Sequence, residues 1–253
     1  MANKLYEETD IAAIATAIRG KNGSSDTYTV SQMANAIANI PSGGTSWEFP
    51  ANACLGSSSF TSLPSDFVFA TRTSCASLFR LCSSMTTAPS ASKLDTSSVT
   101  TMQEMFGYCS ALNAAGLPTD NDGYLAYDTS SCTNFNGMFR NCTNLASVPI
   151  LFGKLRYATN ISNMFNGCSS LTTINANFGF LSSVTNASNM FAGCTNLSSS
   201  SLNTIMSSGW VGSSLASANK TLKYLGFTSG QATTITGLSA WSTLSSNGWT
   251  TGY

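Results

Sequence analysis

One hydrophobic pattern returns five times in the chain between Leu78 and Leu197. In each unit a Met or Leu is followed directly by a Phe, and a Cys lies three positions after that Phe. In the last four units a Leu lies three positions after the Cys. Successive cysteines are 27, 33, 26 and 26 residues apart, and the phenylalanines give the same series. Such a period is typical of repeat proteins, in which each unit covers the apolar edge of the next.

The pattern predicts an α/β repeat solenoid of about five coils, each with one short parallel strand plus turns or a short helix. With strands about 4.8 Å apart, the stack would be roughly 20 Å long. Asn134, Asn160 and Asn186 share one offset, and Asn163 and Asn189 share another, where an amide can bond backbone groups that turns leave unpaired. The predicted repeat core consists of Phe79, Cys82, Phe106, Cys109, Phe139, Cys142, Phe165, Cys168, Phe191 and Cys194.

The start of the chain does not follow the repeat. Residues 1–40 predict a helical hairpin, because apolar side chains recur at helical spacing after a capping Asp10 and again after Thr29. A Gly-Gly linker and an N-terminal cap are expected over 41–59, and the repeats over 60–205. The apolar positions of the hairpin are Ile11, Ile14, Ile18, Met33 and Ile37.

The end of the chain, residues 206–253, predicts a C-terminal helical cap that keeps the last coil from water. One helix is expected to begin at Thr228 or Ser229 and to end at Gly248. Its apolar positions are Ile235, Leu238, Trp241 and Leu244.

Composition and charge narrow the possible functions. Eleven Lys and Arg balance eleven Asp and Glu, and there is no histidine. The absence of a basic cluster argues against nucleic acid as the main partner. Without histidine, Ser-His and Cys-His catalysis and Cys-His zinc sites are excluded. The apolar runs fall far short of the roughly 18 residues that a spanning helix needs, so no membrane insertion is expected, and the acidic start predicts no signal peptide.

The cysteines are expected to be structural. The five repeat cysteines share one offset and none belongs to a Cys-x-x-Cys pair, which favours free buried thiols over disulfides or metal. Cys54, Cys75 and Cys132 lie outside this series, and a single bridge among them is left open. We expect no metal and no cofactor.

The candidate binding site is the long spacer that makes one repeat 33 residues instead of 26. Its acidic and aromatic side chains would suit a glycan or a cation; the alternative is a solvated excursion whose acids pair with Lys154 and Arg156. A carboxylate pair for glycoside hydrolysis and the Ser90-to-Lys93 motif are both disfavoured, so no catalytic residue is assigned. The candidate binding residues are Asp120, Asp122, Tyr124, Tyr127 and Asp128.

A second surface lies at the predicted strand row, which carries small hydroxyl side chains without aromatic rings. Such a face suits packing or weak adhesion better than deep ligand capture. Its members are Thr86-Thr87, Ala146-Ser147, Thr172-Thr173 and Ser198-Ser199.

The units 138–145, 164–171 and 190–197 resemble the Met-Phe-x-x-Cys-x-x-Leu repeats of BspA-like leucine-rich proteins of bacteria and their viruses. The resemblance covers about 60–205, and the first unit departs from it with Leu78 for Met and Met85 for the late Leu. Residues 9–33 are similar to a short N-terminal module of structural proteins in phages of Gram-positive hosts, and residues 238–250 to the C-termini of phage repeat proteins.

These resemblances imply a non-enzymatic virion component with a repeat domain for adhesion or decoration. Residues 1–40 would dock onto other virion proteins, and the repeat domain would face outward, toward a host cell-surface glycan if it binds one. The protein would be assembled in the host cytoplasm and reside on the virion surface. The alternative is a bacterial cell-surface leucine-rich-repeat adhesin, against which the missing export signal counts. Placement on head or tail, and a homo-oligomeric state, are left open.

Overall fold

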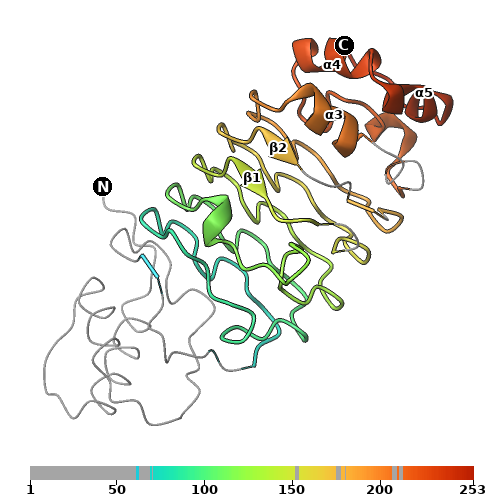
Figure 1. Cartoon of the computed structure of the whole chain (residues 1–253). Helices are drawn as coiled ribbons and strands as arrows, with labels where there is room; N and C mark the ends of the chain where they lie inside the picture. Colours follow the sequence, from blue (N-terminus) through green and yellow to red (C-terminus); the bar gives the residue numbers. More distant parts are fainter. Residues whose placement is uncertain are drawn as a thin grey trace, which may run out of the picture.

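The computed structural model describes residues 61–62, 69, 71–151, 154–174, 178–179, 181–206, 210 and 213–253. The described chain runs as successive coils laid side by side and ends in a group of short helices (Figure 1). The expected hairpin over 1–40, with Ile11, Ile14, Ile18, Met33 and Ile37, lies outside the described residues, as does the linker and cap over 41–59.

Each coil contains one copy of what we call a repeat segment, and the backbones of neighbouring segments are paired. The segments are residues 73–85, 100–112, 133–145, 159–171 and 185–197. The N–H of the repeat Phe donates to the carbonyl of the Met one coil later, as from Phe106 to Met138 and from Phe139 to Met164, both at 2.9 Å. Parallel bridges join Ser74 to Thr101 and continue in register through Asn134, Asn160 and Asn186.

Extended strands are short. The strands β1 (Ser147–Val148) and β2 (Thr173–Ile174) pair in parallel, with Ser147 opposite Thr173. They lie in the predicted strand row, and the 3-10 helix η1 (Ala114–Gly116) is part of an earlier coil. Because this sheet has two strands, the assignment to a leucine-rich-repeat solenoid stays a prediction.

Each repeat segment turns twice through left-handed backbone. The first turn has positive φ at Ser77, Glu104, Gly137, Asn163 and Asn189, and the second at Leu81, Tyr108, Asn141, Gly167 and Gly193. Asn and Gly tolerate this conformation best, which explains their presence in the later coils. At Gly167 there is also no space, since a Cβ would lie 1.9 Å from the Asn141 Oδ1.

The asparagine side chains that precede these turns form hydrogen bonds with the backbone two residues later. Asn134, Asn160 and Asn186 each accept, through Oδ1, the N–H two residues later, at 3.1 Å. These Asx turns give a peptide N–H at the start of the last three segments a partner that the coil ladder does not supply, and the Ser74 and Thr101 hydroxyls accept the corresponding N–H in the first two.

The core of the stack is a column of rings beside a column of thiols. The repeat phenylalanines from Phe79 to Phe191 stack at centroid distances of 5.6 to 5.9 Å, and Phe227 continues the column 5.1 Å from Phe191. The cysteine Sγ of each later coil donates to the Phe carbonyl of the coil before, at 3.0 to 3.1 Å. All ten predicted repeat-core residues are at most 1% exposed.

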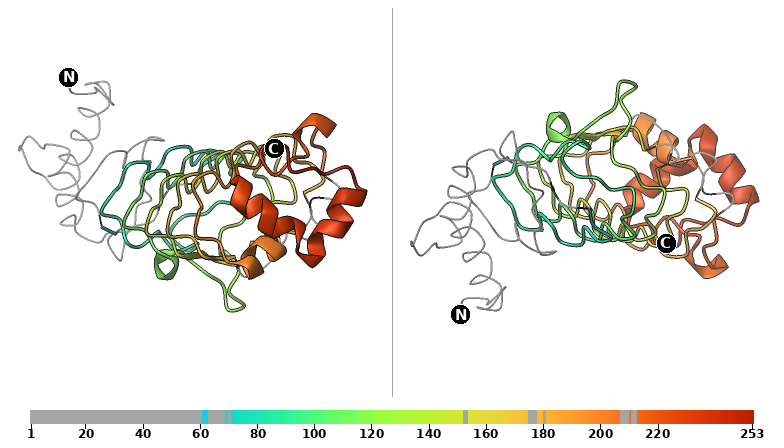
Figure 2. Two further views of the ribbon diagram at one scale, coloured as in Figure 1. Left: turned by 90° about the horizontal axis from the view of Figure 1, so that it is seen from above. Right: turned by 90° about the horizontal axis from the view of Figure 1, so that it is seen from below.

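Short helices cover the C-terminal end of the stack (Figure 2). They are α3 (Ser199–Ile205), η3 (Ser217–Asn219), α4 (Ser229–Thr236) and α5 (Ser239–Ser246). The single helix expected from Thr228 onward is therefore wrong in extent. Thr228 does cap α4, in a capping box with Gln231, but α4 ends at Thr236 with Gly237 as its C-cap, and a second helix begins after Leu238.

Candidate functional site

The predicted binding loop is held by one of its own carboxylates. Asp120 Oδ1 accepts the N–H of Asp122 at 3.1 Å and that of Tyr124 at 2.9 Å. Thr119 and Leu125 form an antiparallel bridge around this turn. Asp120 and Asp122 are exposed at its tip, and the half-buried Tyr124 pairs with Ile150 of the next coil. The Asp120 carboxylate thus already has structural donors.

Tyr127 does not lie on the loop surface, contrary to the expectation. Its side chain is fully buried, its hydroxyl donates to the Pro89 carbonyl at 2.7 Å, and its ring stacks on Phe106 at 6.3 Å. Burial raises the pKa of its phenol well above 10.0. Leu125, two positions earlier, is buried as well, so this stretch alternates like a strand and directs Tyr127 inward. Tyr127 therefore offers no ring to a ligand.

Asp128 lies apart from the loop tip. Its Oδ1 accepts the Ser130 N–H at 2.8 Å, and bonds from Ser130 lower the pKa of its carboxyl, with a smaller contribution from the Lys154 ammonium. Lys154 Nζ itself donates to the Tyr127 carbonyl at 3.3 Å. The five predicted binding residues are thus divided between an exposed turn, the core and a second turn, and they do not converge on one cavity.

A more regular surface, which we call the hydroxyl face, occupies the start of the repeat segments. Exposed threonines at the first position of each segment form a column, and from Thr100 to Thr185 each hydroxyl donates to the carbonyl of the preceding threonine at 3.2 to 3.5 Å. A second column lies two residues earlier in each coil, beyond one inward residue. The two columns are Thr73, Thr100, Thr133, Thr159 and Thr185, and Thr71, Ser98, Ser131, Tyr157 and Ser183.

Tyr157 is the residue of this face that sequence analysis missed. Its side chain is 50% exposed, and the Arg156 guanidinium lies 5.7 Å from its ring centroid. The signal was available, because Ala158 occupies the inward offset and strand alternation then places Tyr157 and Thr159 outward. Tyr157, and not Tyr127, therefore presents an exposed aromatic ring on this face.

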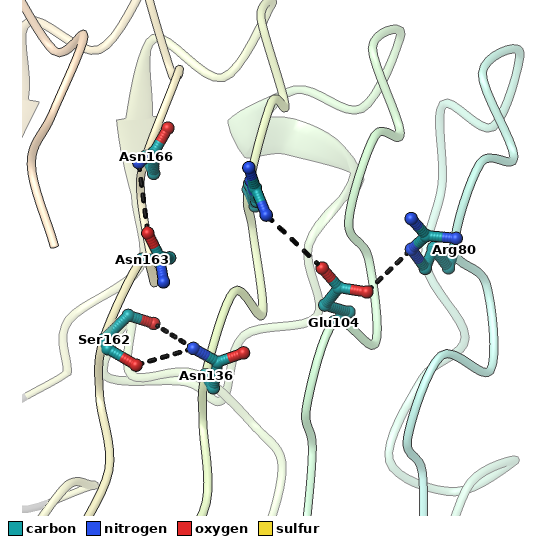
Figure 3. A network of polar contacts seen from close by, with 7 residues as sticks. Arg80, Glu104, Asn136, Ser162, Asn163 and Asn166 are labelled. Carbon is teal, nitrogen blue, oxygen red and sulfur yellow. Dashed lines mark hydrogen bonds and ion pairs between the residues drawn. The ribbon is translucent and has the colours of Figure 1, made fainter. Parts of the chain in front are cut away.

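The third feature is a group of charged and aromatic side chains from three consecutive coils, which we call the arginine–glutamate cluster. Arg80 Nε lies 2.7 Å from Glu104 Oε2, an ion pair visible in Figure 3, and Arg140 Nη1 lies 3.8 Å from Glu104 Oε1. The guanidinium carbons of Arg80 and Arg140 lie 5.1 and 5.7 Å from the Tyr108 ring centroid. The coil that provides Glu104 and Tyr108 lies between the two that provide the arginines.

The buried thiols do not form a reactive site. Desolvation raises the pKa of Cys75 to about 11 and those of Cys132 and Cys194 to about 12, and it raises those of Cys142 and Cys168 well above 9.0. These five remain protonated near neutral pH, whereas a nucleophilic cysteine needs a lowered pKa. Cys75 and Cys132 are free thiols, so neither contributes to the bridge left open above, and Cys54 lies outside the described residues.

Within the described part of the chain, no three His, Cys, Asp or Glu side chains are arranged to hold a metal ion. None of the helices described there is long and apolar enough to cross a membrane.

Comparison with protein-family models identifies a family for the repeats. A family model described as "Mycoplasma protein of unknown function, DUF285" matches residues 73–205, which span all five repeat segments. This is a repeat family related to BspA-like repeat proteins. No curated protein and no solved structure matches the chain.

Proposed function

The chain belongs to the DUF285 family, and on that premise we propose that it is a non-enzymatic structural protein of a phage virion whose repeats serve surface adhesion or decoration. The phage setting is supported by the resemblance of residues 9–33 and 238–250 to phage structural proteins. In this proposal residues 1–40 dock onto the particle and the repeat domain faces outward.

The observation that supports this function best is the hydroxyl face. It repeats one threonine in every coil, in register. Each Thr hydroxyl from Thr100 to Thr185 donates its hydrogen bond to a carbonyl of the neighbouring coil. The oxygen lone pairs then remain as acceptors for an outside donor. A shallow surface of this kind makes weak contacts, and many copies on one particle raise their combined strength.

The docking half of the proposal is tested by deleting residues 1–40. Particles assembled in cells that produce only the deleted chain should not incorporate it. The purified deleted chain should keep the melting temperature of the repeat domain. Immunoblots of purified particles, and immunogold labelling of intact ones with antibody against residues 73–205, measure incorporation, and circular dichroism melts of the purified chain measure the melting temperature. Particles that still carry the deleted chain would place the anchor elsewhere.

The adhesion half is tested by competition. Purified full-length chain should reduce attachment of particles to host cells, and the matched variant Tyr157→Ala should compete less well. Tyr157 is half exposed, so this change should leave the melting temperature unaltered. Unchanged attachment in excess chain would restrict the function to decoration.

A second candidate is an adhesin on the surface of a bacterial cell. The description of the family, which refers to Mycoplasma proteins, favours it. The two candidates predict different locations: the first places the chain in purified particles, and the second places it on cells that carry no phage. Surface proteolysis of such cells, followed by detection of peptides from residues 73–205, distinguishes them.

A further inference from the structure

The five repeat segments are almost free of charge, and their charged side chains all meet at one place. Over residues 73–85, 100–112, 133–145, 159–171 and 185–197, the Lys, Arg, Asp and Glu side chains are Arg80, Glu104 and Arg140 alone. These three form the arginine–glutamate cluster. One carboxylate faces two guanidinium groups, so the cluster carries one uncompensated positive charge on an otherwise neutral surface.

The two arginines are not equivalent. Arg80 makes a close ion pair with Glu104, with Nε 2.7 Å from Oε2, and its side chain is 25% exposed. Arg140 Nη1 stops 3.8 Å from Oε1, beyond hydrogen-bond distance, and its side chain is 38% exposed. The Nε atoms of Arg80 and Arg140 are both buried without a hydrogen bond of good geometry to a described residue, so the two arginines differ in their distance from Glu104 and in exposure. The Arg140 guanidinium is therefore held beside Glu104 and Tyr108 while donors of its fork remain unused.

The backbone at Glu104 and Tyr108 of the cluster has a left-handed conformation that is unfavourable for these side chains. Glu104 has φ 49° and Tyr108 has φ 65°. The equivalent positions of the last two coils hold Asn163 and Gly167, and Asn189 and Gly193, which tolerate the left-handed region. A bulky side chain in that region is strained, but the first coil has the same conformation at Ser77 and Leu81, so this strain follows from the repeat turn and does not by itself mark a site.

We propose that the arginine–glutamate cluster binds an acidic glycan, with a carboxylate or phosphate of the glycan taken by the Arg140 guanidinium beside Tyr108. A guanidinium matches the planar fork of a carboxylate or the oxygens of a phosphate, and the Tyr108 ring, 5.7 Å from the guanidinium carbon, supports its position. The setting is the adhesive function proposed above, on which this inference rests.

The surroundings favour a glycan over an acidic peptide. The neighbouring coils carry no further charge and present the partly exposed amides of Asn136, Asn163 and Asn166, whereas Ser162 beside them is buried (Figure 3). Asn136 Nδ2 donates to the Ser162 hydroxyl at 2.6 Å and Asn166 Nδ2 to Asn163 Oδ1 at 3.2 Å. Each amide retains donors or acceptors for sugar hydroxyls. A polyanionic peptide would need several positive charges in a row, and the segments provide two arginines.

The test is isothermal titration calorimetry of the full-length chain with four probes. They are a galacturonate oligomer, the same oligomer as its methyl ester, a phosphodiester-linked sugar oligomer and an oligoglutamate peptide. The galacturonate, the phosphodiester or both should bind, and their ratio identifies the anionic group. The methyl ester should bind at least about tenfold more weakly, a loss of about 1.4 kcal/mol. Binding should weaken between about 50 and about 200 mM salt.

Variants with opposite expected effects distinguish ligand binding by the cluster from a purely structural role of its ion pairs. Arg140→Gln should weaken binding about tenfold, and Arg140→Lys should weaken it less because the charge remains without the fork. Glu104→Gln should tighten binding several-fold, because it removes the competing carboxylate. Arg156→Gln removes the same charge outside the cluster and should change the affinity by less than about twofold.

Several results would overturn the proposal. These are wild-type affinity in Arg140→Gln, weaker binding in Glu104→Gln, equal binding of the methyl ester, and equal binding of oligoglutamate. Circular dichroism melts show that each variant is folded, and Glu104→Gln decides the matter if Arg140→Gln does not fold. If particles attach to cells but no acidic oligomer binds, this inference fails and the adhesive function stands. If the oligomer binds but excess purified chain does not reduce attachment of particles to cells, this inference stands and the adhesive function fails.

Discussion

Phe165 shows how much of the packing depends on single residues. Its ring lies 5.8 Å from Phe139 and 5.9 Å from Phe191, so it contacts the coils on both sides. Phe165→Ala would leave a cavity in the column and should lower the free energy of unfolding by about 3–5 kcal/mol. Urea unfolding measures this change. The exposed control Tyr157→Ala should change it by less than about 0.5 kcal/mol. A loss below about 1 kcal/mol in Phe165→Ala would contradict the central role of the column.

The thiols predict how stability depends on pH. Burial raises the pKa of Cys194 from 9.0 to about 12 and raises that of Cys168 well above 9.0. Above about pH 9 the unfolded chain therefore loses protons that the folded chain keeps. It then binds fewer protons than the folded state, and stability falls as pH rises toward the folded pKa. The melting temperature should be constant from neutral pH to about pH 9 and should decline between pH 9 and about 12.

The matched control for this prediction is Cys168→Ala, which removes one such group. Its melting temperature should be lower at neutral pH because a cavity is created, but its alkaline decline should be shallower than that of the wild type. The seven described cysteines, all buried free thiols, should react with thiol reagents only as the protein unfolds. A melting temperature that stays flat through the alkaline range would mean that the thiols are not buried in solution.

At the residue scale, the spacing of the sequence identified the repeat Phe and Cys positions, because a fixed offset survives in one dimension. It misjudged Tyr127, since charge and aromatic content alone do not tell which way a spacer residue points. The inward alternation of Leu125 and Tyr127 would have done so. The arginine–glutamate cluster was not foreseen, because Arg80, Glu104 and Arg140 become neighbours only when three coils are in register.

At the scale of elements, the connection from the last repeat to the C-terminal cap depends on Gly226. Its φ is 91°, and a Cβ there would lie 2.6 Å from the Ala192 nitrogen. Gly226→Ala should therefore cost about 1–3 kcal/mol of unfolding free energy. Gly230→Ala is the matched control: it lies in α4, has only Thr228 Oγ1 near the new Cβ at 4.0 Å, and should be neutral or slightly stabilising. Equal melting temperatures for the two variants would contradict this account.

The division of the C-terminal cap into α4 and α5 shows why element boundaries escaped the sequence. The start at Thr228 was predictable from its capping box with Gln231. The start of α5 was not, because Leu238 provides no side-chain cap. Asn203 of α3 supplies it instead, with Oδ1 accepting the Ala240 N–H at 3.1 Å. A cap that comes from 37 positions away has no local signal.

On the scale of the whole molecule, the period of the sequence predicted that neighbouring units pack on one another, and the register follows from the coil ladder. The sequence did not show how the stack ends. Residues 221–227 act as one more coil: the N–H groups of Asn189 and Phe191 donate to the carbonyls of Tyr224 and Leu225, and Phe227 covers Phe191. The cysteine pattern is absent there, so the period could not reveal this coil.

That last coil makes the C-terminal cap a barrier against association of stacks. A chain ending at residue 216 would expose the Phe191 ring and leave the Asn189 and Phe191 N–H groups without their Tyr224 and Leu225 acceptors. An uncovered end of this kind is a template for another chain. The truncated chain should form larger species than the full-length chain in light scattering, increasingly so with concentration. Tyr253→Ala, which alters the cap without removing the coil, should scatter like the full-length chain. A truncated chain of unchanged size and melting temperature would show that the stack ends at Leu197 without needing the coil that follows.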